Sequence, residues 1–345
     1  MEYMKILDNN IFQNNKKKKL LIYISISVII IFLVILIIVL STSSKSKKDS
    51  QKSFERYLNT PKALYAWQYY NTQYFLDFLT TQKFQRVYIN VGKIYNSYDD
   101  YFSKGEWKYK EFNEDHLEVL VKKLNDLNIE VELVSFLELD QEDFTDWERI
   151  LDLAKMVKKL NETHKIKALH IDQEPEDINS FENLLWMYRK LSEIVKVSGI
   201  IMHSWIYNKL ENVPFKNATF KKEFNDCENV YEAVVKVCDY TDLMAYNKEY
   251  DTTQRYMEEY AQISIKFGKE YTNLIHVAPE EGSTERLSIL KTYKENKNKF
   301  FDFIADMGEK YGMIGFHPYY SWYEALYCDP YPQDPFHSGK PLECP

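Results

Sequence analysis

The feature that most constrains the fold is an alternation, from Pro61 onward, of short apolar runs and amphipathic stretches. Strand-like runs occur at Ala63–Trp67, Arg86–Val91, Glu130–Phe136, Ala168–Gln173, Gly199–Ser204, Asp242–Tyr246, Asn273–Val277 and Gly312–Phe316. Helical spacing lies between them at Asn113–Leu127, Trp147–Glu162, Ser180–Val197, Thr253–Phe267 and Phe300–Tyr311. Eight strands alternating with helices over about 260 residues predict an α/β fold, a (β/α)8 TIM barrel.

A doubly wound open sheet is the alternative to the barrel. Such sheets usually carry a glycine-rich phosphate turn after an early strand. This chain has only nine glycines and contains neither GxGxxG nor GxxxxGK[ST], so the alternative lacks its marker. Two loops that follow strands, Gly92–Phe112 and Trp205–Cys238, are longer than a minimal barrel needs, and barrels place specificity in such loops.

The N-terminal part is not globular. Residues 1–19 are polar and end in four lysines, and Leu20–Leu40 then gives 21 consecutive residues without a charge. A helix of that length spans about 30 Å, the thickness of a bilayer core. The pattern predicts a single-pass type II signal anchor with a lumenal or extracellular C-terminal domain, and a cleavable signal ending near Ser41 is the alternative. We therefore expect a cytoplasmic tail (1–19), a transmembrane anchor (20–40), a flexible stalk (41–60), the barrel (61–328) and a Pro/Cys tail (329–345).

Two further patterns agree with an extracytoplasmic domain. The sequons Asn161-Glu162-Thr163 and Asn217-Ala218-Thr219 predict N-glycosylation at Asn161 and Asn217. An even number of cysteines in such a domain favours disulfides. Short loops favour the pairs Cys227–Cys238 and Cys328–Cys344 over the other pairings, and four free thiols are the alternative.

The net charge of the chain indicates which kinds of partner it can bind. The chain has a formal net charge of −8, and residues 1–40 carry five lysines and two acids, so the remainder carries −11. An acidic domain without a basic stripe is a poor ligand for nucleic acid, so we expect no nucleic-acid partner. Aromatic residues make up 16% of the chain, which suits a domain with aromatic-lined surfaces.

The stretch Lys167–Glu176, KALHIDQEPE, starts apolar and ends in acids. Asp172 and Glu174 are two residues apart and therefore lie on one face of a strand, and Pro175 ends that strand. Charged groups at the end of a buried strand are costly unless they are paired or have a task. In a parallel barrel this position is the mouth of the active site. The alternative is that both acids face water and cap the following helix.

Other strand ends deliver aromatic and polar side chains. The expected set is Trp67, Gln68, Asn90, His170, His203, Trp205, Tyr246, Asn247, Glu280, Glu281, His317, Tyr319, Tyr320 and Trp322. Carboxylates ringed by flat aromatic rings are typical of carbohydrate sites, so carbohydrate is the expected partner beside the membrane. Histidines at four strand ends, His276 included, raise the question of zinc. Because no HxH or HExxH spacing exists, we expect no metal and no cofactor. The histidines are expected to hydrogen-bond to a carboxylate or to pack in the barrel core.

Three of these motifs carry a family resemblance. KALHIDQEPE resembles the DGxDxDxE motif of glycoside hydrolase family 18, DLMAYN resembles its MxYD/N pattern, and GMIGFHPYYSW resembles its last strand, which ends in a substrate-platform tryptophan. The chain is also similar to a looser set of uncharacterised barrel proteins with GxHxDxEP and HxYxxW motifs. The resemblance spans about residues 61–325.

The resemblance implies roles for individual residues. Glu174 matches the general acid, Asp172 the acid that orients an N-acetyl group, Tyr246 the tyrosine that contacts it, and Trp322 the platform under the sugar. There are departures, because Lys167 and His170 stand where two aspartates belong and Ala168 replaces the glycine. The implied function is a membrane-anchored glycosidase-like barrel acting on extracytoplasmic glycan; the alternative is a catalytically silent glycan-binding or surface membrane protein on the same fold.

Repulsion between the adjacent acids and partial burial are expected to raise the pKa of one of them, so that Glu174 is protonated near neutral pH and can donate to a leaving oxygen. The attacking group is then either the acetamido group of the sugar, held by Asp172 and Tyr246, or a carboxylate from Glu280 or Glu281.

Overall fold

The structure is a computed structural model that describes residues 48–66, 72–95, 114–138, 147–175, 178–203, 205, 215–277, 287–318, 322 and 326. The chain divides into two compact units after Glu55, and the barrel belongs to the unit Arg56–Pro345. Within the described ranges no helix has both the length and the apolar character needed to cross a membrane. The predicted anchor, Leu20–Leu40, lies outside these ranges, as does the tail 329–345.

Residues 48–59 are helical, which corrects the expectation of a flexible stalk over 41–60. The stretch Phe54–Leu58 explains the difference. Phe54, Tyr57 and Leu58 have the i, i+3, i+4 spacing of an amphipathic helix, and this local pattern prevails over the Ser/Lys-rich composition.

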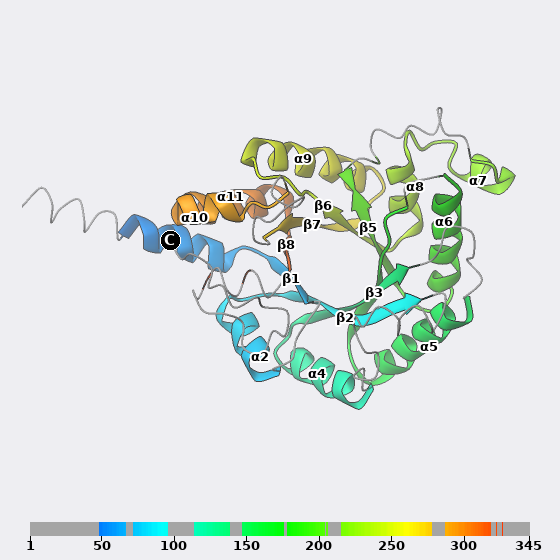
Figure 1. The fold of residues 1–345 in the computed structure, drawn as a ribbon, viewed down its shortest axis with the longest axis horizontal. Coiled ribbons are helices and arrows are strands. Elements are labelled where there is room, and N and C mark those ends of the chain that lie inside the picture. The colour runs from blue at the N-terminus through cyan, green and yellow to red at the C-terminus, as the bar shows by residue number, and fades with distance from the viewer. Residues whose placement is uncertain are drawn as a thin grey trace, which may run out of the picture. The chain divides into compact units, whose positions relative to one another are not determined.

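Eight parallel strands close into a barrel in chain order, which confirms the predicted fold class (Figure 1). All eight predicted strands are present, with ends that shift by a few residues. Their bounds are β1 Lys62–Ala66, β2 Arg86–Tyr95, β3 Glu130–Glu138, β4 Ile166–Asp172, β5 Val197–Met202, β6 Tyr240–Met244, β7 Glu270–His276 and β8 Ile314–His317. The register of β1 with β8, including Leu64 opposite Phe316, completes the closure.

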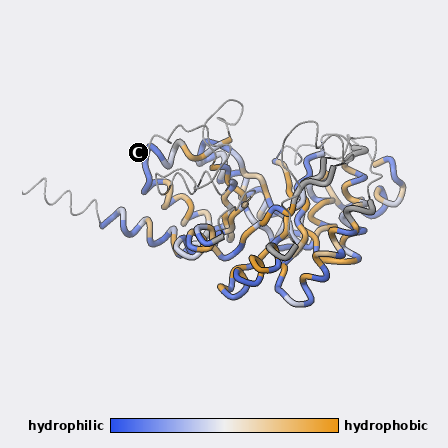
Figure 2. Tube along the Cα trace, turned by 60° about the horizontal axis from the view of Figure 1, so that its bottom comes forward, coloured by the Kyte–Doolittle hydropathy of each residue, from blue (hydrophilic) through white to orange (hydrophobic). Residues whose placement is uncertain are grey.

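Helices surround the strands (Figure 1). They are α2 Thr72–Thr81, α4 Glu114–Asp126, α5 Trp147–Thr163, α6 Ile178–Ser192, α7 Ala218–Glu223, α8 Val230–Val237, α9 Tyr250–Lys266, α10 Leu290–Glu295 and α11 Lys297–Tyr311. Their turns alternate between hydrophobic and hydrophilic residues, as an amphipathic helix on a barrel requires (Figure 2). The long connection after β5 carries α7 and α8.

The strands are buried on both faces, as expected for parallel strands covered by helices, and all five residues of β1 are buried. A cluster of buried residues from five strands can meet only inside the barrel: Ala63, Tyr65, Tyr88, Val134, Ile200 and Leu274. Polar residues accompany it, because Arg86, Glu132, His170, Ser198, Asp242 and Thr272 are also buried. The interior is therefore a packed but polar core.

Arg86 links this interior to the N-terminal ends of the strands. Its guanidinium donates to Glu130 at 2.8 Å and to Glu270 at 2.5 Å, the first residues of β3 and β7. Lys167 near the start of β4 donates to the same Glu270 at 2.6 Å. Acidic and basic side chains thus alternate at the N-terminal end of the barrel. The candidate site lies at the opposite end, the C-terminal mouth.

Two glycines are required by geometry. Gly312 follows α11 with φ +84°, a left-handed conformation that residues with a Cβ rarely adopt. At Gly315 in β8, a Cβ would lie 2.3 Å from Cδ2 of Leu274, so only glycine allows this close packing inside the barrel.

Candidate functional site

The C-terminal ends of β4, β7 and β8 and the segment after β6 bring together one group of side chains. Tyr246 and two imidazoles form a triangle, with the Tyr246 ring centroid 5.2 Å from that of His276 and 5.9 Å from that of His317. The two imidazoles are 5.6 Å apart, and Tyr65 of β1 lies 5.3 Å from His317. Burial lowers the pKa of His276 to about 4 and that of His317 to about 3, so both rings are neutral at physiological pH. The mouth therefore offers flat, uncharged rings.

Asp172 ends β4 beside this group. Its side chain is 4% exposed, and Oδ1 has no hydrogen-bond partner among the described residues. Burial raises the pKa of Asp172 to about 7; the charge of His170 opposes this shift, and those of Glu174 and Asp242 add to it. Asp172 thus titrates near neutral pH.

Glu174 follows two residues later and is exposed. The expectation was that repulsion and burial would act on Glu174; in the structure the buried carboxyl is Asp172. The two acids still share a neighbour. Burial raises the pKa of Tyr246 well above its usual value, and the charges of Asp172 and Glu174 contribute to that rise. A buried acid, an exposed acid and a tyrosine therefore lie within electrostatic reach of one another.

Of the other predicted residues, some lie within the described part of the chain and some lie outside it. Asn247 belongs to the turn before α9, where its Oδ1 accepts from the backbone N–H of Glu249 at 2.9 Å. His203 faces α9 instead of the mouth, since its ring stacks on Tyr256 at 3.4 Å. Trp67, Tyr319, Glu280 and Glu281 lie outside the described residues.

Trp322 does not form a platform, which corrects the sequence-based interpretation. The side chain is fully buried, and its indole N–H donates to the Tyr57 hydroxyl at 3.2 Å. Its ring stacks on Phe316 of β8 at 5.1 Å and lies 5.2 Å from Phe300 of α11. The apolar outer face of β8 and α11 needs a large partner, and Trp322 supplies it.

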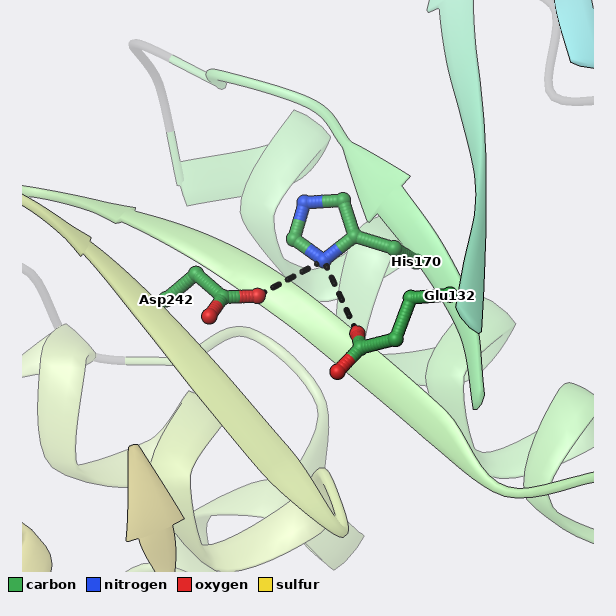
Figure 3. A group of neighbouring side chains, drawn as sticks. All are labelled: Glu132, His170 and Asp242. Carbon is green, nitrogen blue, oxygen red and sulfur yellow. Dashed lines mark ion pairs between the residues drawn. The ribbon is translucent and has the colours of Figure 1, made fainter. Parts of the chain in front are cut away.

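Beneath Asp172, a buried cluster joins three strands (Figure 3). His170 of β4 directs Nδ1 toward Asp242 of β6, 3.0 Å from Oδ2, and toward Glu132 of β3, 3.9 Å from Oε2. Ser198 of β5 lies between them, 2.7 Å from the same nitrogen. His170, one of the histidines expected to bond to a carboxylate or to pack in the barrel core, is completely buried, with Nδ1 3.0 Å from a carboxylate oxygen of Asp242. Glu132 and Asp242 were not predicted, although an acid inside an apolar strand is itself a signal of a buried network.

This cluster is the one group among the described residues that could hold a metal ion, since Glu132, His170 and Asp242 place one ligand atom each within 4.8 Å of one another. A metal would need the Nδ1 lone pair of His170. That nitrogen is instead within hydrogen-bond distance of Ser198 and Asp242, and Arg86 lies 3.5 Å from Glu132. The donor set therefore fits a proton better than a divalent ion.

The cysteines correct another expectation. Cys227 and Cys238 are both free and buried, so the predicted bridge between them is absent. The eight-residue helix α8 separates them and is about 12 Å long at 1.5 Å per residue, farther than a disulfide reaches. Cys328 and Cys344 lie outside the described residues.

No protein-family model and no curated protein matches the sequence. Solved structures with similar folds include glycoside-hydrolase barrels. A putative α-L-fucosidase from Bacteroides thetaiotaomicron is 15% identical, with 74% of this chain and 85% of that chain covered and a TM-score of 0.46. A GH113 β-1,4-mannanase is 10% identical, with coverages of 74% and 86% and a TM-score of 0.48. A xylanase-α-amylase inhibitor protein solved with trehalose is 13% identical, with coverages of 78% and 95% and a TM-score of 0.47. Likenesses this distant identify no substrate.

Replacing Asp172 by Asn is expected to stabilise the protein above neutral pH. The pKa of this carboxyl is raised from 3.8 to about 7 by folding, so ionisation of Asp172 destabilises the folded protein. The free energy of unfolding therefore falls as pH rises through this interval. At about 1.36 kcal/mol per pKa unit, Asp172→Asn should add about 1–4 kcal/mol to the free energy of unfolding at pH 8, and almost nothing near pH 4. Urea unfolding at both pH values measures this. The exposed Asp152→Asn is the control, and a gain that is equal at both pH values would contradict the burial of Asp172.

Proposed function

We propose that the barrel acts on a glycan bound at its C-terminal mouth, with Glu174 as general acid and Asp172 as the carboxyl that orients the substrate. The observation that supports this proposal is that Asp172 and Glu174 both lie near Tyr246. The negative charges of the two acids contribute to the raised pKa of the tyrosine. Because Glu174 is exposed and Asp172 is buried, the two acids are suited to different roles. An exposed carboxyl can reach the leaving oxygen, and a buried one can hold a polar group of the sugar.

The neighbourhood of Asp172 favours the substrate-assisted route over a second carboxylate from Glu280 or Glu281. Tyr246 and Asp172 lie together at the end of the strands, as is needed to hold an acetamido group between a hydroxyl and a carboxyl. Neutral His276 and His317 add donors and flat faces without adding charge. We therefore infer that 2-acetamido sugars are the preferred substrates.

A catalytically silent glycan-binding barrel is the second candidate, and Lys167 favours it. This residue stands where the resemblance expects the first aspartate of the relay. The Lys167 side chain instead lies at the opposite end of the barrel, where its ammonium group forms ion pairs with the carboxylates of Glu270 at 2.6 Å and Glu130 at 3.4 Å. The relay of carboxylates is therefore replaced in part by a structural ion pair.

A panel of aryl glycosides, with and without a 2-acetamido group, tests the proposal on the full-length protein, together with calorimetric binding of the matching oligosaccharides. Turnover of acetamido substrates supports the enzyme. Saturable binding without turnover supports the silent barrel, and the absence of both refutes action on glycans.

The proposal includes the location of the barrel. We propose that Leu20–Leu40 anchors the chain in a membrane and that the barrel is extracytoplasmic and glycosylated. Both sequon asparagines have structural roles. Oδ1 of Asn161 accepts from the N–H of Ile166 at 2.9 Å, and Asn217 caps α7 by accepting from the N–H of Thr219 at 2.8 Å.

Thr163→Ala with Thr219→Ala therefore removes both sequons and keeps these asparagines. We expect the full-length protein from a glycosylating host to lose mass on endoglycosidase treatment, and the double variant to lose none. Equal mobility of wild type and variant, together with labelling of the domain by cytosolic reagents, would place the barrel in the cytosol.

A further inference from the structure

His170 lies directly beneath the candidate acid. It precedes Asp172 by two residues in β4, so both side chains point to the same side of the sheet, into the barrel. The imidazole is completely buried. Around it stand one residue from each of several strands: Tyr65, Tyr88, Glu132, Ser198 and Asp242.

The directions of the hydrogen bonds place a proton on Nδ1 of His170. The Ser198 hydroxyl donates its proton to Oε2 of Glu132 at 2.5 Å, so Oγ of Ser198 is left to accept from Nδ1 of His170 at 2.7 Å. Oδ2 of Asp242 lies 3.0 Å from the same nitrogen, at ion-pair distance. On the other side of the ring, Nε2 pairs with the Tyr65 hydroxyl.

Donors and one cation surround the two acids beside His170, Glu132 and Asp242. Glu132 faces Ser198 with one oxygen and Arg86 with the other, at 3.5 Å. Asp242 faces Nδ1 with Oδ2 and accepts from the Tyr88 hydroxyl with Oδ1 at 2.6 Å. Arg86 lies beside Glu132 but is not paired with Asp242, so a cation at His170 supplies the partner that a buried acid at Asp242 needs.

The electrostatics agree with this geometry. Burial alone lowers the pKa of His170, but the hydrogen bond to Asp242 and the charges of Asp242, Glu132 and Asp172 outweigh burial, and the pKa is raised. In turn, the charge of His170 lowers the pKa of Asp172, against burial and against the acids Glu174 and Asp242. Tyr65 and Tyr246 also face Asp172, and burial keeps both phenols neutral.

We infer that His170 is a positioning residue for the mouth: a buried imidazolium, held from beneath by Asp242 and the Ser198–Glu132 pair, whose charge stabilises the carboxylate form of Asp172. The cation replaces the carboxylate that the family resemblance expects at this position. The role of Asp172 toward substrate rests on the proposed function, whereas the charge of His170 is a property of the free protein.

The test is a titration of Asp172 by NMR, with ¹³C-labelled aspartate in the full-length protein and the signal assigned by its loss in Asp172→Asn. His170→Asn keeps an N–H donor near the position of Nδ1 and removes the charge. We expect the titration midpoint of Asp172 to rise by about 1–3 pH units, the usual effect of losing an opposite charge nearby. His276→Asn, which removes a neutral imidazole from the same mouth, should leave the midpoint unchanged.

Nitrogen-15 spectra of labelled histidine in the wild type provide a second measurement, which does not need a folded variant. Both ring nitrogens of His170 should carry protons at pH 6, and addition of Zn²⁺ should not change the Nδ1 signal. An unmoved Asp172 midpoint, a neutral ring, or a Zn²⁺-dependent Nδ1 signal would each overturn the inference. A shifted midpoint in a protein that turns over no glycoside and binds none would instead refute the proposed function alone.

Discussion

Glu174→Gln is expected to lower kcat on 2-acetamido glycosides by about 10²–10⁴-fold, the usual contribution of a general acid. The amide keeps the shape of the side chain but has no proton to transfer to the leaving oxygen. Because Glu174 is exposed and Asp172 lies beneath it, the change should leave the fold intact and glycan binding equal or tighter. Initial rates with aryl glycosides, and calorimetry with an uncleaved oligosaccharide, measure the two effects.

Glu193→Gln is the matched control. This exposed glutamate lies in the connection from α6 to β5, at the end of the barrel opposite to the mouth, so its loss should not change the rate. Substrates with a highly activated leaving group need less protonation, and Glu174→Gln should slow their glycosylation step less. A rate that does not change for any leaving group, together with a fall in melting temperature, would make Glu174 a structural acid.

Arg86→Leu is expected to be the most destabilising single change in the barrel. The guanidinium is 2% exposed and pairs with Glu132, which is completely buried, as well as with Glu130 and Glu270. Removing it leaves a buried carboxylate uncompensated, which typically costs about 3–5 kcal/mol. Urea unfolding of the full-length protein measures the loss.

The loss should depend on pH in a defined direction. Burial raises the pKa of Glu132 to about 7, and Arg86 is one of the groups that opposes this rise. Without Arg86 the pKa of Glu132 rises further, so stability is lost as pH rises, and the deficit is larger at pH 8 than at pH 5. Adding Glu132→Gln should recover part of it at pH 8.

Lys122→Leu is the control for the loss of a cation. Lys122 is 64% exposed and pairs with Asp126 on the surface of α4, a kind of pair usually worth under about 1 kcal/mol. If Arg86→Leu costs no more than Lys122→Leu at either pH, the ion pairs of Arg86 do not compensate the buried acid.

The architecture of the barrel can be predicted from local sequence patterns. Apolar runs of strand length alternating with amphipathic helices predict a barrel, because a parallel strand buried on both faces must be apolar along its length. For the same reason the pair Asp172 and Glu174 could be placed at a strand end, and Tyr246 at the end of β6. These inferences need only local periodicity, which each segment carries in its own residues.

Three features become apparent only in the folded barrel: which acid is buried, what Trp322 packs against and whether the cysteines meet. Burial depends on neighbours that are distant in sequence; in this barrel they bury Asp172, whose pKa is raised, and leave Glu174 exposed. Trp322 is enclosed by Tyr57 and Phe316, and α8 keeps Cys227 from Cys238. The cluster of Glu132, His170 and Asp242 arises from closure of the barrel, which brings β3, β4 and β6 together in its interior (Figure 3). The periodicity of one strand does not show which side chains of other strands it will contact.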